Sequence, residues 1–128
     1  PTPAALKILA VDDDGLILLN TSALLEDLGH RVLEASSGRQ ALEILEAHPD
    51  IDLLITDQAM PNMTGTQLVQ EVTSLRPTLP IILATGYGEL PPGFEGKILK
   101  LTKPFTQAVL QAAVIEAVQK PQDVLLSD

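Results

Sequence analysis

The sequence contains no cysteine among its 128 residues. This absence excludes disulfides, thiolate metal sites and cysteine nucleophiles, and it is typical of a reducing compartment. Aromatic residues are also scarce, at 2%, with no tryptophan and a single tyrosine. The core must therefore be built from leucine, isoleucine, valine and alanine, in a chain whose length suits one compact domain. We expect a single domain over residues 1–128.

Basic residues are outnumbered, with 8 lysines and arginines against 17 aspartates and glutamates, and the formal net charge is -9. A field of this sign repels phosphates, which disfavours direct binding of nucleic acid. No apolar run approaches the roughly 18 residues of a membrane span, and the N-terminus lacks a secretion signal pattern. We expect a cytoplasmic protein without membrane insertion. Because the chain begins at Pro1 rather than methionine, we also expect it to derive from a larger protein.

Short apolar runs alternate with segments of helical periodicity. Strands are predicted at 6–11, 31–35, 51–56, 80–85 and 97–101. Helices are predicted at 16–28, after Ser37 up to Pro49, at 64–75 and at 106–119. The residues expected to face the core include Ile17, Leu24, Leu25 and Leu28 in the first helix and Val109, Leu110, Ala113 and Ala117 in the last. This alternation predicts a three-layer α/β fold, doubly wound around a five-stranded parallel sheet.

The connections between these elements carry further signals. Asp14 and Ser37 are expected to cap the helices that follow them. The stretch 86–96 is rich in glycine and contains two adjacent prolines, which leaves room for about one helical turn. A fourth helix should therefore be short or absent. The folded core is expected to span about 6–119, with 120–128 as a tail.

Polar and charged side chains gather where the predicted strands end. Asp12 and Asp13 follow the first strand and Asp57 the third, while Thr85 ends the fourth and Lys103 follows the fifth. In open parallel sheets, ligand sites lie beyond the carboxyl ends of the strands, so these side chains should meet at one edge. Two unit charges about 4 Å apart interact by roughly 4 kcal/mol at an effective dielectric constant near 20. Three clustered carboxylates therefore require cations.

Lys103 supplies one positive charge, and Mg²⁺ suits the remainder because it prefers oxygen ligands and accepts phosphate oxygens. Zinc is disfavoured without cysteine or paired histidines. The pattern predicts a phosphoryl-transfer site in which Asp57 is the nucleophile. Lys103 and Mg²⁺ would neutralise the moving charge, and Thr85 would donate a hydrogen bond to the phosphoryl group.

Four segments carry these residues in order: VDDD, ITDQAMPNMTG, LATGY and LTKPF. Over about residues 6–119 they resemble the receiver domain of two-component response regulators. The resemblance implies a flavodoxin-like (CheY-like) sheet and phosphorylation of Asp57 by a histidine kinase or a histidine phosphotransfer protein. The sequences of these segments are most similar to those of receivers at the C-terminus of hybrid sensor histidine kinases.

The resemblance also implies individual roles. Asp13, Asp57 and the backbone carbonyl of Ala59 would bind Mg²⁺, and Asp12 would act mainly through water. Lys103 would contact the phosphate and precede a cis peptide bond, and Thr85 would move toward the phosphate as the switch. Such a domain catalyses only its own phosphorylation and dephosphorylation and is not otherwise an enzyme.

Differences from the receiver family leave other functions to consider. The family often has an aromatic residue three positions before the lysine, where this chain has Lys100. This difference and the lack of room for a full fourth helix at 86–96 leave open a pseudo-receiver that docks proteins without switching. A phosphatase with an aspartyl nucleophile would need a second acid where Ala59 stands.

Tyr87 is expected near the phosphate, where it would restrict attacking water. The two histidines are expected to be structural rather than phosphoacceptors.

Overall fold

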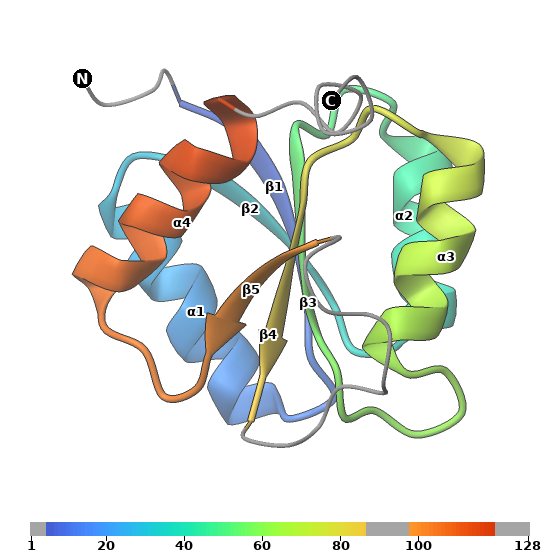
Figure 1. The fold of residues 1–128 in the computed structure, drawn as a ribbon, viewed down its shortest axis with the longest axis horizontal. Helices are drawn as coiled ribbons and strands as arrows, with labels where there is room; N and C mark the ends of the chain where they lie inside the picture. The colour runs from blue at the N-terminus through green and yellow to red at the C-terminus, as the bar shows by residue number, and fades with distance from the viewer. Residues whose placement is uncertain (1–4, 87–97, 120–128) are drawn as a thin grey trace.

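The computed structural model describes residues 5–86 and 98–119. Strands and helices alternate along the chain (Figure 1). The strands are β1 (Lys7–Val11), β2 (Arg31–Ala35), β3 (Leu53–Asp57), β4 (Ile81–Thr85) and β5 (Leu99–Thr102), and the helices are α1 (Gly15–Asp27), α2 (Gly38–Ala47), α3 (Gly65–Leu75) and α4 (Gln107–Gln119). The expectations for Tyr87, for a short fourth helix and for the tail 120–128 fall outside the described residues.

All strand pairs are parallel, and the sheet order is β2-β1-β3-β4-β5. This is the predicted flavodoxin-like arrangement. Helices α1 and α4 cover one face of the sheet and α2 and α3 cover the other, which makes three layers (Figure 1). The strand order reverses at β1, because β2 lies on one side of it and β3 on the other. The carboxyl ends of β1 and β3 therefore meet at the position where such sheets bind ligands.

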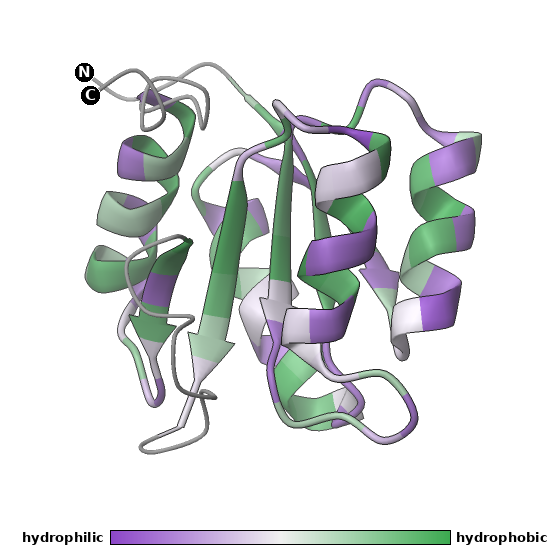
Figure 2. Cartoon of the chain, turned by 45° about the vertical axis from the view of Figure 1, so that its right-hand side comes forward, coloured by the Kyte–Doolittle hydropathy of each residue, from purple (hydrophilic) through white to green (hydrophobic). Residues whose placement is uncertain are grey.

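The sheet separates two apolar clusters. Strands β3 and β4 are buried along their whole length, as expected for parallel strands covered on both faces. One cluster packs beneath α2 and α3 and includes Leu9, Leu54, Leu68, Val69 and Val72. The other packs beneath α1 and α4 and includes Ile8, Ile55, Leu25, Leu110 and Val114. Figure 2 shows hydrophobic residues concentrated in the strands, with hydrophilic residues on the outer sides of α2 and α3.

Two helices bury most of the predicted inward residues, including Leu25, Leu110, Ala113 and Ala117, but each has one exception. In α1, Leu18 rather than Ile17 is buried with Leu25, and in α4 Val109 is exposed while its neighbour Leu110 is buried. The inward assignments of Ile17 and Val109 were wrong. Both helices carry apolar residues around most of their circumference, so the sequence period alone does not assign every residue to the correct face.

The helix starts agree with the predicted caps. The Oδ1 atom of Asp14 accepts hydrogen bonds from the backbone N–H of Leu16 at 3.0 Å and of Ile17 at 3.3 Å. The hydroxyl of Ser37 accepts one from the N–H of Gln40 at 3.1 Å. Each contact satisfies an amide that the helix itself leaves without a partner. Asp14 is therefore engaged at the start of α1.

Both histidines make structural contacts. The Nδ1 atom of His30 accepts a hydrogen bond from the N–H of Leu6 at 3.1 Å, and burial lowers the pKa of this imidazole below its ordinary value. The Nδ1 atom of His48 lies 3.1 Å from Nζ of Lys7, which also pairs with Asp50 at 2.9 Å. These residues adjoin the amino ends of the strands, the edge opposite to the aspartate cluster.

Among the residues that the structure describes, none of the helices has both the length and the apolar character that crossing a lipid bilayer requires.

Candidate functional site

The ends of β1 and β3 position the acidic residues. The N–H of Asp12 donates to the carbonyl of Ala35 at 3.1 Å, which extends the β1–β2 pairing to the start of the loop. The Oδ1 atom of Asp12 accepts from the N–H of Asp14 at 2.9 Å, which fixes the carboxylate. Asp57 is the last residue of β3 and is only 4% exposed, whereas Asp13 is exposed to solvent. The cluster therefore has a buried floor and an open side.

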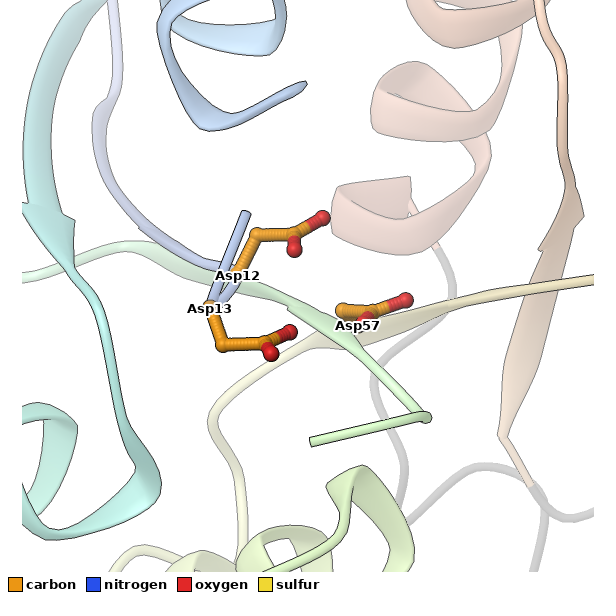
Figure 3. Close-up of side chains that lie close together, drawn as sticks. All are labelled: Asp12, Asp13 and Asp57. Carbon is orange, nitrogen blue, oxygen red and sulfur yellow. The ribbon is translucent and has the colours of Figure 1, made fainter. Parts of the chain in front are cut away.

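Three carboxylates meet at this edge. Asp12, Asp13 and Asp57 each offer an oxygen, and these oxygens lie within 4.8 Å of one another. Figure 3 shows the side chains from the β1 loop beside the side chain at the end of β3. Grouping three carboxylates costs free energy unless positive charge lies close by. Positive charge close to this cluster is therefore stabilising.

Lys103 provides the first cation. Its Nζ atom pairs with Oδ1 of Asp57 and lies 3.6 Å from Oδ2 of Asp12. Its backbone N–H donates to the carbonyl of Thr85 at 2.8 Å, so the β4–β5 pairing continues beyond Thr102 and brings Lys103 to the acidic edge. The peptide bond between Lys103 and Pro104 is cis, as the resemblance implied. A single ammonium leaves the three carboxylates incompletely neutralised.

The donor set fits Mg²⁺. The clustered atoms are hard carboxylate oxygens, and the exposed position of Asp13 leaves one side of the site open to water and phosphate. Mg²⁺ typically binds one or two protein carboxylates and keeps several waters, which matches a half-open cluster. Asp12, with a side-chain exposure of 9%, already binds a backbone amide and lies near Lys103. The more exposed Asp13 and the strand-end Asp57 are better placed to hold an added ion.

The two remaining predicted residues lie at the same edge. Thr85 is the last residue of β4 and is buried, and it lies one position beyond Ala84, which pairs with Asp57. Ala59 is exposed and lies in the loop after β3, two residues beyond the strand-end carboxylate. Lys100 is half-buried in β5 and pairs with Leu83 of β4.

The sequence interpretation overlooked two residues at the site. Gln58 follows Asp57 and is buried, and its side chain hydrogen-bonds to Thr66 at the start of α3. Gly65, the first residue of α3, approaches the end of β3 so closely that a Cβ there would clash with the carbonyl oxygen of Asp57. Gly65 could have been noticed in the sequence because it directly follows the cap Thr64. Glycine is common just after the end of a helix but not at its first position, so a glycine there indicates a close contact.

Comparison with known proteins identifies the fold and the family. The family model of the response regulator receiver domain matches residues 8–115. The chain is 32% identical over 117 residues to the transcriptional regulatory protein GlrR of Escherichia coli, covering 88% of this chain and 26% of that protein. It is 35% identical over 127 residues to a chemotaxis protein CheY homolog of Campylobacter jejuni, covering 94% of this chain and 92% of the homolog. It thus spans about a quarter of the regulator and nearly all of the CheY homolog.

Solved structures give the same result. A response regulator receiver domain protein from Clostridium thermocellum superposes with a TM-score of 0.83 at 36% identity, covering 94% of this chain and 98% of that one. The receiver domain of the hybrid histidine kinase CckA superposes with a TM-score of 0.74 at 32% identity, covering 88% and 99%. With these matches over most of its length, the chain belongs to the response regulator receiver domain family of two-component signalling.

Proposed function

We propose that this chain is a phosphoacceptor receiver in which Asp57 takes a phosphoryl group from a phosphohistidine donor in a Mg²⁺-dependent reaction. The donor is a histidine kinase or a histidine phosphotransfer protein, and the phosphorylated chain changes conformation. One observation carries the proposal: the buried carboxylate of Asp57 pairs with Lys103 and shares its surroundings with Asp12 and Asp13. This combination supplies a nucleophile and charge stabilisation at one place.

The chemistry follows from these side chains. A carboxylate oxygen of Asp57 attacks phosphorus, the P–N bond to the donor imidazole breaks, and the departing ring nitrogen keeps the electron pair and takes a proton from water. The product is an acyl phosphate on Asp57. Lys103, which pairs with Asp57 before the reaction, would then bind phosphoryl oxygens. Thr85 would donate its hydroxyl hydrogen to another of these oxygens.

Mg²⁺, when bound, would neutralise negative charge on the phosphoryl oxygens during transfer. Asp13, Asp57 and the backbone carbonyl of Ala59 would hold it, and Asp12 would bind it through water. The new phosphoryl group adds about -1.5 to -2 charges, and its contacts would bias two conformations that differ by a few kcal/mol. A cytoplasmic location and an origin in a larger hybrid kinase belong to the same proposal, and similarity to the CckA receiver supports that origin.

The test is the intact mass of the wild-type chain after incubation with a small acyl phosphate, with Mg²⁺ and with excess chelator. We expect one added phosphoryl group with Mg²⁺ and none with chelator. No adduct from the small donor or from a phosphorylated histidine phosphotransfer protein would favour the pseudo-receiver alternative instead. Lys100 on β5 is the observation behind that alternative, because it replaces the aromatic residue through which many receivers switch.

Exposed leucines on α1 offer a contact surface for the protein donor. Leu16 is 80% exposed and Leu19 is 62% exposed, and α1 begins just after the acidic cluster. We expect Leu19→Asp to slow phosphoryl transfer from a phosphorylated histidine phosphotransfer protein at least about tenfold, because a buried interface charge without a partner is costly. Phosphorylation by a small acyl phosphate should stay within about twofold, since it needs no protein contact.

Leu75→Asp is the matched control for this prediction. Leu75 is 67% exposed but ends α3, which packs on the opposite face of the sheet and runs away from the acidic edge. Its replacement should leave both reactions unchanged. An equal loss in the two variants, or a loss with the small donor as well, would mean that the leucine on α1 is not a specific docking contact.

A further inference from the structure

A buried glutamine directly follows the proposed phosphoacceptor. We propose that Gln58 is a positioning residue that fixes the loop carrying the third Mg²⁺ ligand, the carbonyl of Ala59, by clamping the start of α3 to the end of β3. The inference deepens the proposed function and rests on it, because that function supplies the metal. Gln58 is 6% exposed, and a buried amide side chain is costly unless its hydrogen bonds are made.

Two hydrogen bonds join the side chain of Gln58 to Thr66 of α3. Its Oε1 atom accepts from the backbone N–H of Thr66 at 2.7 Å, and its Nε2 atom donates to the hydroxyl of Thr66 at 3.4 Å. That hydroxyl also lies 3.1 Å from the hydroxyl of Thr64. The amide therefore joins the strand end to the helix cap across eight residues of sequence.

The backbone of Gln58 is held equally firmly. Its N–H donates to the carbonyl of Ala84 at 3.1 Å, which extends the β3–β4 pairing past Asp57. Its carbonyl accepts from Met60 at 3.1 Å and from Gly65 at 3.0 Å. The bond to Met60 spans two residues and closes a tight turn with Ala59 at its centre. The turn and the clamp leave little freedom for the backbone of Ala59.

Together these bonds complete the first turn of α3. A helix leaves its first N–H groups without internal partners. Here Gly65 donates to the carbonyl of Gln58, Thr66 donates to its side chain, and Gln67 donates to the hydroxyl of Thr64 at 3.3 Å. Gln58 thus supplies the acceptors for two successive amides. Loss of its side chain would release the loop at the point where it leaves the acidic edge.

The test measures Mg²⁺ binding rather than phosphorylation. Calorimetric titration with MgCl₂ is compared for the wild type, Gln58→Met and Gln67→Met. Methionine keeps the length of glutamine, but its thioether has no N–H to donate and is only a weak acceptor for the N–H of Thr66. Gln67 is the control because its side chain also caps α3, by accepting from the N–H of Thr64 at 2.9 Å, but does not reach β3.

We expect the Kd for Mg²⁺ to rise at least about tenfold in Gln58→Met, as is typical when a residue supporting a metal ligand is lost. Gln67→Met should stay within about twofold of the wild type while its unfolding temperature falls. Unchanged affinity in Gln58→Met, or equal losses in both variants, overturns the inference. A wild type that binds no Mg²⁺ overturns the proposed function and this inference with it, which separates the two failures.

A second measurement uses the wild type alone and does not depend on a variant that folds. Coupling between two sites is reciprocal, so Mg²⁺ binding should strengthen the clamp. We expect hydrogen exchange of the Thr66 amide to slow at least about threefold on adding Mg²⁺, relative to the amide of Gln40. The Gln40 amide is the control because it also donates to a side-chain oxygen at the start of a helix, the hydroxyl of Ser37 at 3.1 Å. Equal slowing of both amides, or of neither, contradicts the inference.

Discussion

Replacing Asp57 by asparagine will abolish the phosphoryl adduct in Mg²⁺ while the chain stays folded. An amide oxygen is a far weaker nucleophile than a carboxylate, so the covalent step loses its attacking group. The fold should survive because Lys103 keeps an ion-pair partner, with its Nζ atom 3.6 Å from Oδ2 of Asp12. The mutation also removes one of three mutually repelling carboxylates. Intact mass after incubation with a small acyl phosphate, together with circular dichroism, measures both effects.

The matched control is Asp52→Asn. Asp52 lies just before β3 at the other edge of the sheet, where its Oδ2 atom accepts from the N–H of Lys7 at 2.9 Å. This variant should gain one phosphoryl group as the wild type does. A persisting adduct in Asp57→Asn would place the acceptor elsewhere, and loss of the adduct in both variants would point to general damage rather than to a lost nucleophile.

Replacing Gly65 by alanine will lower the free energy of unfolding by about 3 kcal/mol, because the added methyl group would overlap neighbouring atoms. Its Cβ would clash with the carbonyl oxygen of Asp57 and lie 2.7 Å from Cδ1 of Leu83 and 2.9 Å from Cα of Gln58. Two of these atoms belong to backbone at the end of β3. The start of α3 must therefore move away from the sheet, and the free energy of unfolding in urea should fall accordingly.

Gly38→Ala is the control for that prediction. Gly38 begins α2 as Gly65 begins α3, but its Cβ would meet the side chain of Met63, with Sδ at 2.5 Å and Cγ at 2.9 Å. Methionine is flexible and can turn aside, and alanine favours a helix over glycine. The free energy of unfolding should therefore change by less than about 1 kcal/mol. Equal losses in the two variants would contradict the close approach at Gly65.

The sequence predicted the layers and most of the site for a simple reason. Buried parallel strands are short apolar runs, and their carboxyl ends share one edge, so residues after separate strands can be brought together without knowing any distance. This reasoning placed Asp12, Asp13, Asp57 and Lys103 together, and the structure does the same. The flavodoxin-like strand order came from the family resemblance and is confirmed.

Other features depend on contacts that no local pattern records. The predicted strand at 51–56 begins later, at Leu53, because the N–H of Ile51 donates back to the carbonyl of His48 in a turn. The roles of Gln58 and Gly65 arise only when α3 is packed against the end of β3. Here the deciding distances join residues of different elements, and hydrophobic periodicity contains no information about them.

The outermost strands of the described sheet affect how the protein behaves at high concentration. Strands β2 and β5 stand at its two margins, and each carries charge, with Arg31 and Glu34 in β2 and Lys100 in β5. An unpaired margin invites a strand from another molecule and is a common origin of fibrous aggregates, but a lysine there makes such an addition unfavourable. Lys100 thus disfavours the addition of a further strand along β5.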